Sequence, residues 1–251
     1  MTAFLTLIER EYYRFARLAA QTIAPPIIMT ILFVVIFGYS LGSQIESISG
    51  FRYILYILPG IAGMGVITNS YSNSSTSLFM ARTDRSIENI LVAPLSYTKI
   101  VTAFVIGGIT RGMVVGGITL LVAIPLAGLK IQHGALTIFF LLAISAIFSA
   151  LGVISALWAE DWEHLATFSN FVITPFVYLG GVFYSVSMLP GVWKKISHAN
   201  PMFYLIDGLR WAVLGKGEIA PQIAIGVTLG LVSLTLMTAV GLFQRGYKLI
   251  V

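Results

Sequence analysis

Six long apolar stretches, nearly free of charged residues, limit what this 251-residue chain can fold into. A helix of about 20 predominantly apolar residues crosses a hydrocarbon core about 30 Å thick. Such a helix also satisfies its own backbone hydrogen bonds, which an irregular segment exposed to lipid cannot do. The pattern therefore predicts an all-α membrane protein with six transmembrane helices, at residues 22–42, 53–80, 100–126, 135–157, 166–184 and 220–243.

The composition excludes an ordinary soluble domain. Only 10% of the residues are charged and 57% are hydrophobic, whereas soluble domains carry about 25% charged residues. Because the spans use most of the chain, we expect residues 1–251 to form a single transmembrane domain, with any catalytic or energy-converting domain on another chain. The net charge of +5 is expected to face anionic lipid headgroups rather than nucleic acid. With no cysteine, disulfides and thiolate metal sites are excluded.

The N-terminal segment 3–20 has the periodicity of an amphipathic helix. Its apolar residues fall on one face: Phe4, Ile8, Tyr12, Phe15 and Ala19. Its basic residues fall on another: Arg10, Arg14 and Arg17. This pattern favours a helix that lies in the membrane interface, where the apolar face meets acyl chains. A plain cytoplasmic helix is the alternative.

Charged residues in the connectors indicate the orientation. With the N-terminus inside, eight Lys and Arg residues lie on the cytoplasmic side and six on the outer side. The inner flank of the first span holds the three arginines of segment 3–20, against Arg52 on the outer flank. Because cytoplasmic loops carry an excess of Lys and Arg, we expect a multi-pass membrane protein with both termini in the cytoplasm.

The connector between the fifth and sixth spans is apolar but broken. Turn-forming residues interrupt it at Pro190, Asn200 and Pro201, so neither piece is long enough to cross a membrane. Short, interrupted apolar segments are tolerated at membrane depth where protein covers them. We therefore expect outer re-entrant helices within residues 185–216. Asp207 and Arg210 are three residues apart and can form an ion pair within one of them.

The second span is polar in its second half. Asn69, Asn73 and Thr76 recur at helical spacing, beside a neighbouring stripe of Ser70, Ser74 and Ser77. Polar groups in this position need water, a polar cavity or partners on other helices. The stripe is therefore interpreted either as the lining of a conduit or as a set of inter-helix hydrogen bonds.

The third span contains the only charged residue within the six predicted spans, Arg111. A charge inside the membrane is costly and rarely faces lipid. Two interpretations are open: a place on a substrate path or polar contact, or a structural bond to backbone carbonyls or to Asn69 and Asn73. Glycines recur at four-residue spacing around it and favour close helix packing: Gly108, Gly112 and Gly116.

The loop between the second and third spans predicts a short amphipathic helix over residues 84–94. Asp84 is a candidate N-cap, and Pro94 ends the helix. An apolar face is formed by Ile87, Ile90 and Leu91. A helix projecting from two long spans suits docking to a soluble partner; a loop lying on the surface is the alternative.

Catalytic motifs are missing from the sequence. The three histidines, His133, His164 and His198, lie on different connectors and have no metal-ligand spacing. The acidic cluster at 160–163 is interpreted as a solvated turn. No phosphate-binding loop occurs. The chain is therefore not expected to be an enzyme.

Two segments resemble the ABC-2 type permease family. Residues Ile87 to Val101 resemble the element after that family's second span, and Thr174 to Arg210 resemble its fifth-span signature. The signature's parts occur here in order, as Gly180 to Phe183, Leu189-Pro190, Asn200-Pro201 and Arg210. The likeness extends over essentially the whole chain and is greatest to the YadH-type bacterial inner-membrane branch.

This resemblance implies a permease subunit of an ATP-driven exporter. Two copies would pair as a homodimer, and each would bind a separate ATPase subunit that carries ATP and Mg, with no cofactor on this chain. The helix after the second span would be a coupling helix that contacts the ATPase, through Arg85, Glu88, Asn89, Leu91, Val92, Ala93 and Pro94. The segment at 185–216 would be the outer re-entrant element, with Pro190, Asn200, Pro201, Asp207 and Arg210.

The resemblance implies that substrate passes between the two copies near the second and fifth spans. The sequence does not identify that substrate; aromatic residues such as Phe171, Phe176, Tyr178 and Phe183 are compatible with an amphipathic drug, lipid or glycan. Candidate conduit or inter-helix polar residues are Asn69, Asn73, Arg111, Phe176, Tyr178, Gly180 and Gly181. The aromatic residues are equally compatible with packing. The alternative function is a secondary transporter or channel that works without an ATPase, a class that usually carries ionisable residues within its spans.

Overall fold

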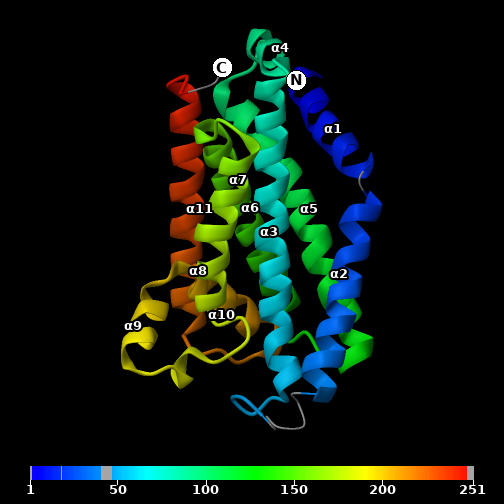
Figure 1. The fold of residues 1–251 in the computed structure, drawn as a ribbon, viewed down its shortest axis with the longest axis vertical. Helices are drawn as coiled ribbons and strands as arrows, with labels where there is room; N and C mark the ends of the chain where they lie inside the picture. The colour runs from blue at the N-terminus through cyan, green and yellow to red at the C-terminus, as the bar shows by residue number, and fades with distance from the viewer. Residues whose placement is uncertain (1, 18, 41–46, 248–251) are drawn as a thin grey trace.

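The computed structural model describes residues 2–17, 19–40 and 47–247. The regular elements in these ranges are helical, which confirms the all-α prediction, and the long helices lie alongside one another in a bundle (Figure 1). In chain order they are α1 (Thr2–Arg17), α2 (Ala19–Phe33) with a π-helix (Val34–Ser40), α3 (Tyr53–Thr83), α4 (Ser86–Val92), α5 (Tyr97–Ala127), α6 (Gly134–Trp158), α7 (Trp162–Phe168) with a π-helix (Ser169–Ile173), α8 (Thr174–Leu179), a 3-10 turn (Val186–Met188), α9 (Gly191–Ala199), α10 (Pro201–Leu214) and α11 (Pro221–Gln244).

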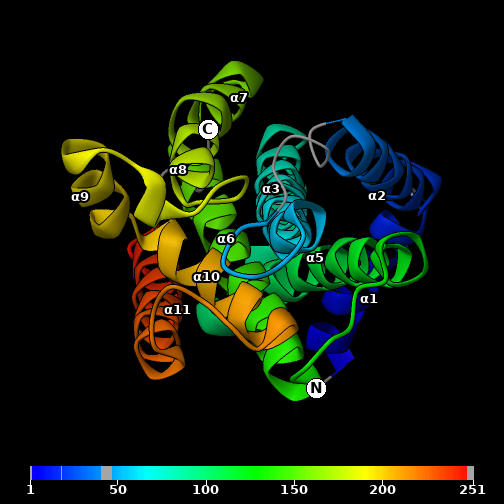
Figure 2. The same cartoon turned by 90° about the horizontal axis from the view of Figure 1, so that it is seen from below.

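Four helices are long and apolar enough to cross a membrane: α3, α5, α6 and α11. They cover the predicted second, third, fourth and sixth spans. Helix α3 packs against α5 and α6, and the view from below shows it between α8 and α2 (Figure 2). The core around it consists of fully buried apolar side chains, among them Ile57, Leu58, Phe140, Phe148 and Leu209.

The two remaining predicted spans are helical but less regular. The apolar part of the first is the shorter segment Thr22–Gly38, and residues 41 and 42 of the prediction lie outside the described ranges. The fifth ends at Leu179, five residues before the predicted boundary, and contains the π-helical turn Ser169–Ile173. Pro175 follows that turn in the first turn of α8, and the π-helical register accommodates its missing backbone donor.

The connector after α8 is built from short helices at the end of the bundle opposite the N-terminus (Figure 1). This agrees with the predicted interruption. Helix α10 is almost entirely buried against α3, α6 and α11. Helix α9 instead exposes Val192, Trp193 and Ile196, and aromatic side chains of this kind suit a membrane–water boundary.

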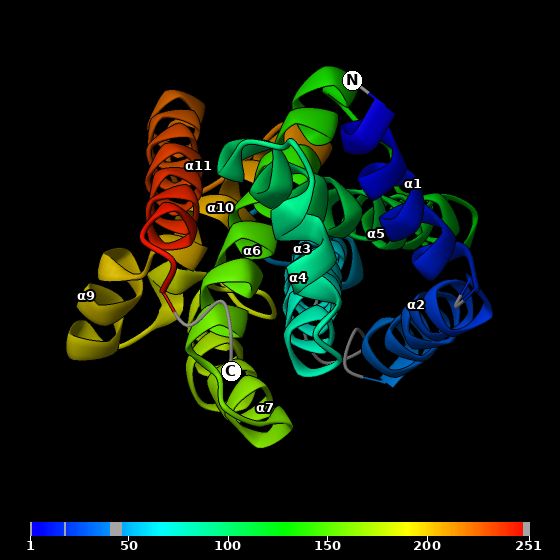
Figure 3. The same ribbon diagram turned by 90° about the horizontal axis from the view of Figure 1, so that it is seen from above.

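Helix α1 packs along α5 at the end that also holds α4 and the C-terminal end of α11 (Figures 1 and 3). The predicted apolar face is wrong in part. Leu7 and Glu11 are buried against the bundle, whereas Tyr12 is 56% exposed. Of the other residues assigned to that face, Ala19 begins α2, and the side chain of Phe15 lies outside the described part of the structure, as does residue 18.

Candidate functional site

The short helix α4 joins α3 to α5 at the end of the bundle that carries the N-terminus (Figure 3). It runs from Ser86 to Val92, which is shorter than the predicted 84–94. The N-cap is Arg85, in the left-handed conformation, so the assignment of Asp84 as N-cap is wrong. Asp84 closes the preceding turn instead, because its Oδ1 accepts a hydrogen bond from the Ser86 backbone N–H at 2.9 Å.

The apolar face of α4 points into the protein. Ile87 and Ile90 are buried in a cluster with apolar side chains of α3, α5 and α6. These two residues therefore anchor the helix to the bundle. The predicted docking residues that remain exposed are Arg85, Glu88, Asn89, Val92 and Pro94, while Leu91 and Ala93 are half-buried.

The base of α4 is fixed by a buried arginine. Arg82, near the end of α3, donates hydrogen bonds to the backbone oxygens of Ala156 and Ala159 at the end of α6. The Arg82 side chain is 4% exposed. These hydrogen bonds join the end of α3, from which α4 continues, to the end of α6.

A groove of about 550 Å³ separates α4 from α1. Its walls combine a cation and a carboxylate, Arg10 and Asp84, with an apolar floor that includes Leu7 and Ile90. Asn89 and Ala93, both predicted as docking residues, also line it. An exposed polar helix beside a partly apolar groove is the kind of surface that receives a segment of another protein.

The serine stripe of α3 packs against the glycines of α5. A Cβ atom added to Gly108 would collide with Ser74 and Ser149, and one added to Gly112 would collide with Ser70. The glycine pattern therefore serves close packing of α5 against both α3 and α6, as predicted. Ser70 and Ser74 are fully buried in that packing and do not line a conduit.

Asn69 and Tyr178 line a different cavity, of about 350 Å³, between α2, α3, α5 and α8. The Asn69 side chain also donates a hydrogen bond to the backbone oxygen of Gly65, at 3.0 Å. The cavity wall is mainly apolar, with threonine hydroxyls among the lining residues at positions 22, 30, 68 and 119. A mixed lining of this kind suits an amphipathic molecule. Phe176 is 44% exposed and is not among the residues that line this cavity.

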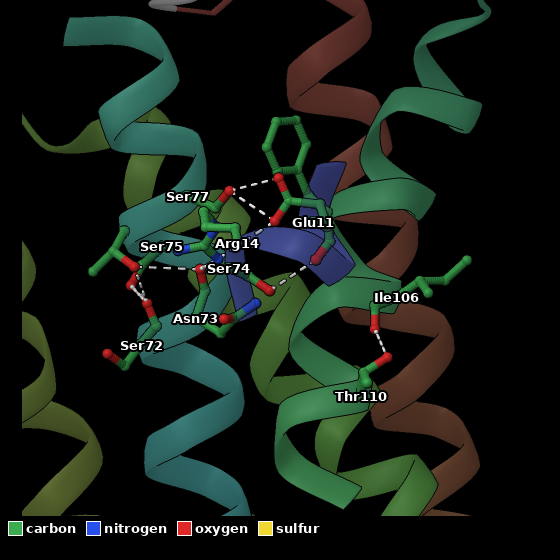
Figure 4. A network of polar contacts seen from close by, with 11 residues as sticks. Glu11, Arg14, Ser72, Asn73, Ser74, Ser75, Ser77, Ile106 and Thr110 are labelled. Atoms are coloured by element: carbon green, nitrogen blue, oxygen red, sulfur yellow. Dashed lines mark hydrogen bonds and ion pairs between the residues drawn. The ribbon is translucent and has the colours of Figure 1, made fainter. Parts of the chain in front are cut away.

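Asn73 belongs to a polar cluster that the sequence did not predict (Figure 4). Its backbone oxygen accepts a hydrogen bond from Arg14 at 2.9 Å. Arg14 also pairs with the Glu11 carboxylate at 3.4 Å, and that carboxylate accepts a hydrogen bond from Ser77 at 2.8 Å. The sequence feature that indicates burial of Glu11 is its position one helical turn after Leu7, which puts both residues on the same side of α1. That side packs against the bundle.

One of the two interpretations of Arg111, structural bonds to backbone carbonyls or to Asn69 and Asn73, finds no support among the described residues. In the described ranges its side chain has no hydrogen bond to Asn69 or Asn73, and its buried Nε atom has no partner. Gly107, one helical turn before Arg111, lies against Glu11 of α1, the residue that pairs with Arg14. Arg111 therefore lies near the face of α5 that meets α1.

Arg210 confirms the predicted pair with Asp207, at 3.3 Å. Both side chains are buried. The guanidinium of Arg210 lies 4.1 Å from the centroid of the Tyr56 ring and donates to the backbone oxygens of Tyr56 and Gly181. Gly181 has a φ of 78°, which explains the second glycine of the Gly-Gly pair.

Glu218 extends this network across the same end of the bundle. Its carboxylate accepts hydrogen bonds from the Tyr56 hydroxyl at 2.9 Å and from the Val186 and Ser187 backbone N–H groups at 3.0 Å. Asp207 in turn accepts the backbone N–H of Glu218, at 2.8 Å. The network fixes the connector between α8 and α11 against α3.

The remaining signature residues shape the backbone. Asn200 caps α10 through its side-chain oxygen and donates from its amide to the backbone oxygen of Phe176, at 2.6 Å. Pro201 follows in the first turn of α10, and Pro190 precedes α9. A Cβ on Gly180 would lie 2.9 Å from Ile206 Cδ1, 3.0 Å from Met202 Cβ and 3.1 Å from the Val177 backbone oxygen, so glycine allows close packing here. Within the described ranges no cluster of three or more metal-ligating side chains occurs.

Comparison with known proteins agrees with the predicted family. The model of the ABC-2 type transporter family matches residues 2–214. The inner membrane transport permease YadH of Escherichia coli (strain K12) is 34% identical over 97% of this chain and 95% of its own length. Nodulation protein J of Sinorhizobium fredii is 22% identical over 83% of this chain and 80% of its own length. Nodulation protein J of Rhizobium meliloti is 23% identical over 90% of this chain and 86% of its own length. The chain belongs to the ABC-2 type transporter family and is a transport permease.

Proposed function

We propose that this permease is the membrane subunit of an ATP-driven exporter in the bacterial inner membrane. Its whole length would form one transmembrane domain of six spans, which pairs with a second copy as a homodimer. Two copies of a separate ATPase would supply ATP hydrolysis with Mg. Support comes from the family, whose members normally work with an ATPase partner, and from the lack of a phosphate-binding loop in this chain.

The observation that carries the proposal is the way in which α4 packs against the rest of the bundle. Its apolar face is buried while Glu88, Asn89 and Val92 point outward beside the groove against α1. A helix held this way can receive force without detaching from the bundle. The ATPase would dock on the exposed face of α4 and insert a segment into the groove.

The proposed orientation in the membrane rests on the elements that lie at the same end of the bundle as α4. Helix α1 and the C-terminal end of α11 lie at the end that carries α4 (Figure 1). We place this end in the cytoplasm, where the ATPase and its nucleotide are found. The short helices α9 and α10 then lie at the outer side, as the proposed re-entrant element.

Coupling requires two arrangements of the helices that the nucleotide biases differently. Closure of the two ATPases would push the α4 helices of the homodimer together. The buried contacts of Ile87 and Ile90, and the hydrogen bonds of Arg82 to α6, would pass that movement into the bundle. The cavity at Asn69 and Tyr178 would then change its exposure to the two sides of the membrane.

The proposed cargo is an amphipathic drug, lipid or glycan. The cavity lined by Asn69 and Tyr178 would take it, because a mainly apolar wall with several hydroxyl groups binds both parts of such a molecule. Export assays with reconstituted complex across these three substrate classes will identify it.

The test is complex formation with the ATPase and ATP-dependent transport in proteoliposomes. Replacing Glu88 and Asn89 together by arginine should abolish co-purification of the ATPase and substrate transport. The matched control is Arg245→Ala, an exposed cation at the same end but on α11, which should retain both. Full complex yield and coupled transport in the double variant would contradict the docking site. Transport by the permease alone, without ATPase, would contradict the exporter proposal itself.

A further inference from the structure

Helix lengths indicate that Arg14 and Arg111 lie near the edge of a hydrocarbon core rather than in its middle. The helical run from Ala19 to Ser40 is about 33 Å long at about 1.5 Å per residue, which matches one hydrocarbon core. Helices α3 and α5 contain 31 residues each and extend well beyond that thickness. Since α1 ends at Arg17, directly before the membrane-crossing run begins, its last turns mark the membrane boundary on the side of the termini.

The contacts of the glycines place Arg111 at the same level. The Cβ position of Gly107 lies 3.1 Å from Glu11 Oε2 and 3.4 Å from Asn73 Nδ2. Arg111 follows Gly107 by one helical turn on the same face of α5. Arg14 follows Glu11 by nearly one turn along α1 and pairs with its carboxylate at 3.4 Å.

Three buried donors at this junction have no hydrogen-bond partner in the described part of the chain. They are Arg14 Nε, Asn73 Nδ2 and Arg111 Nε. The Asn73 side chain is 1% exposed. Buried polar atoms are normally hydrogen-bonded, so three unpaired donors on the neighbouring helices α1, α3 and α5 indicate an acceptor that is supplied from outside the chain.

The charges at the junction specify an anion. Glu11 neutralises one arginine, through its 3.4 Å pair with Arg14. No ion pair involving Arg111 occurs among the described residues, although a cation of this kind normally has a partner. The surface beside Arg14 is a basic groove of about 440 Å³ on α1, lined by Arg10, Tyr13, Arg14 and Arg17. An anion can reach Arg14 through this groove from the headgroup region.

We propose that Arg14, Arg111 and the amide of Asn73 bind the phosphate of an anionic phospholipid from the leaflet on the side of the termini. Arginine recognises phosphate oxygens with its planar donor set. The acyl chains would extend along the apolar surface of α2, which exposes Ile28, Met29 and Leu32. This site is distinct from the partner-docking surface on α4, and its lipid occupant does not depend on which substrate is exported.

The experiment is native mass spectrometry of the purified full chain with added phosphatidylglycerol or phosphatidylcholine. Both lipids contain phosphate, but only phosphatidylglycerol has a net negative charge. The wild-type protein should retain phosphatidylglycerol selectively. Arg111→Gln should reduce the retained fraction about fivefold, since one basic residue at an anionic membrane surface contributes about that factor. Lys99→Gln, an exposed cation on the same helix, is the matched control and should behave like wild type.

Two further arms separate charge from folding and lipid from free phosphate. Arg111→Lys keeps the positive charge and should retain most of the lipid; loss as complete as in Arg111→Gln would overturn the proposal. Glycerol phosphate and inorganic phosphate should not displace the lipid. Displacement by either would identify a site for a free anion and overturn the lipid assignment. Equal retention of the two lipids by the wild type, or wild-type retention in Arg111→Gln, would also overturn it.

Discussion

The carboxylate of Glu11 accepts a hydrogen bond from the Ser77 hydroxyl at 2.8 Å, with both of its oxygens at this distance. Glu11 is 1% exposed. This contact fastens α1 to the polar half of α3, a helix that begins 36 residues after α1 ends. The N-terminal helix is therefore an integral part of the bundle rather than a segment that only lies on its surface.

Replacing Glu11 by alanine should destabilise the fold by about 2–4 kcal/mol, because Ser77 and Arg14 lose a buried charged partner. For a chain of this size the expected fall in Tm is roughly 5–15 °C, measured by thermal unfolding in detergent. Glu9→Ala removes an exposed carboxylate from the same helix and should leave Tm within about 2 °C. Equal Tm values for the two variants would show that the buried contact contributes nothing.

Helix α6 approaches the backbone of α3 closely at Gly152. A Cβ atom there would lie 2.6 Å from the Tyr71 backbone oxygen and 3.0 Å from the Ser75 nitrogen. Because backbone atoms cannot move aside as a side chain can, Gly152→Ala should destabilise the chain by about 1–3 kcal/mol. The comparison is Gly117→Ala on α5, where no atom lies within 4 Å; alanine there should be neutral or stabilising. The Tm values of the two variants, measured by thermal unfolding, test this prediction. A Gly152→Ala variant with the Tm of the wild type would contradict the close packing at Gly152.

The ion pair of Asp207 and Arg210 should be strongly coupled. Arg210→Met leaves the Asp207 carboxylate buried without its counter-charge and should cost about 3–5 kcal/mol. Adding Asp207→Asn should recover part of the loss, so the double variant is more stable than the sum of the single effects predicts. The free energy of unfolding of the wild type, the two single variants and the double variant measures this coupling. Lys216→Met is the exposed control. Strict additivity would mean that the two side chains do not interact.

The sequence was sufficient for features that depend on local spacing. Hydrophobic runs located α3, α5, α6 and α11, because a span leaves a long uninterrupted signal. The Asp207–Arg210 pair was predictable for the same reason, since residues three apart meet on one helix face. Turn-forming residues such as Pro190 and Asn200 likewise marked the real helix boundaries of the outer connector.

Features that depend on contacts between distant segments were not predictable. The period of α4 identifies Ile87 and Ile90 as one face but not whether that face meets a partner or the protein itself; the structure places it inward. The groove between α1 and α4 is formed by residues about 80 positions apart. Burial of Glu11 required knowing that α3 presents Ser77 opposite it. Tertiary packing decides each of these, and a single sequence carries no direct signal for it.

Cross-linking to the cognate ATPase tests the docking surface without disturbing the rest of the chain. Because the chain contains no cysteine, single-cysteine variants report on one position each. We expect Asn89→Cys and Val92→Cys, on the exposed face of α4, to cross-link to the ATPase in proteoliposomes in a manner that changes when ATP binds. Arg245→Cys, at the same end but on α11, should give no product. Cross-links from position 245 with none from 89 or 92 would contradict ATPase docking on α4.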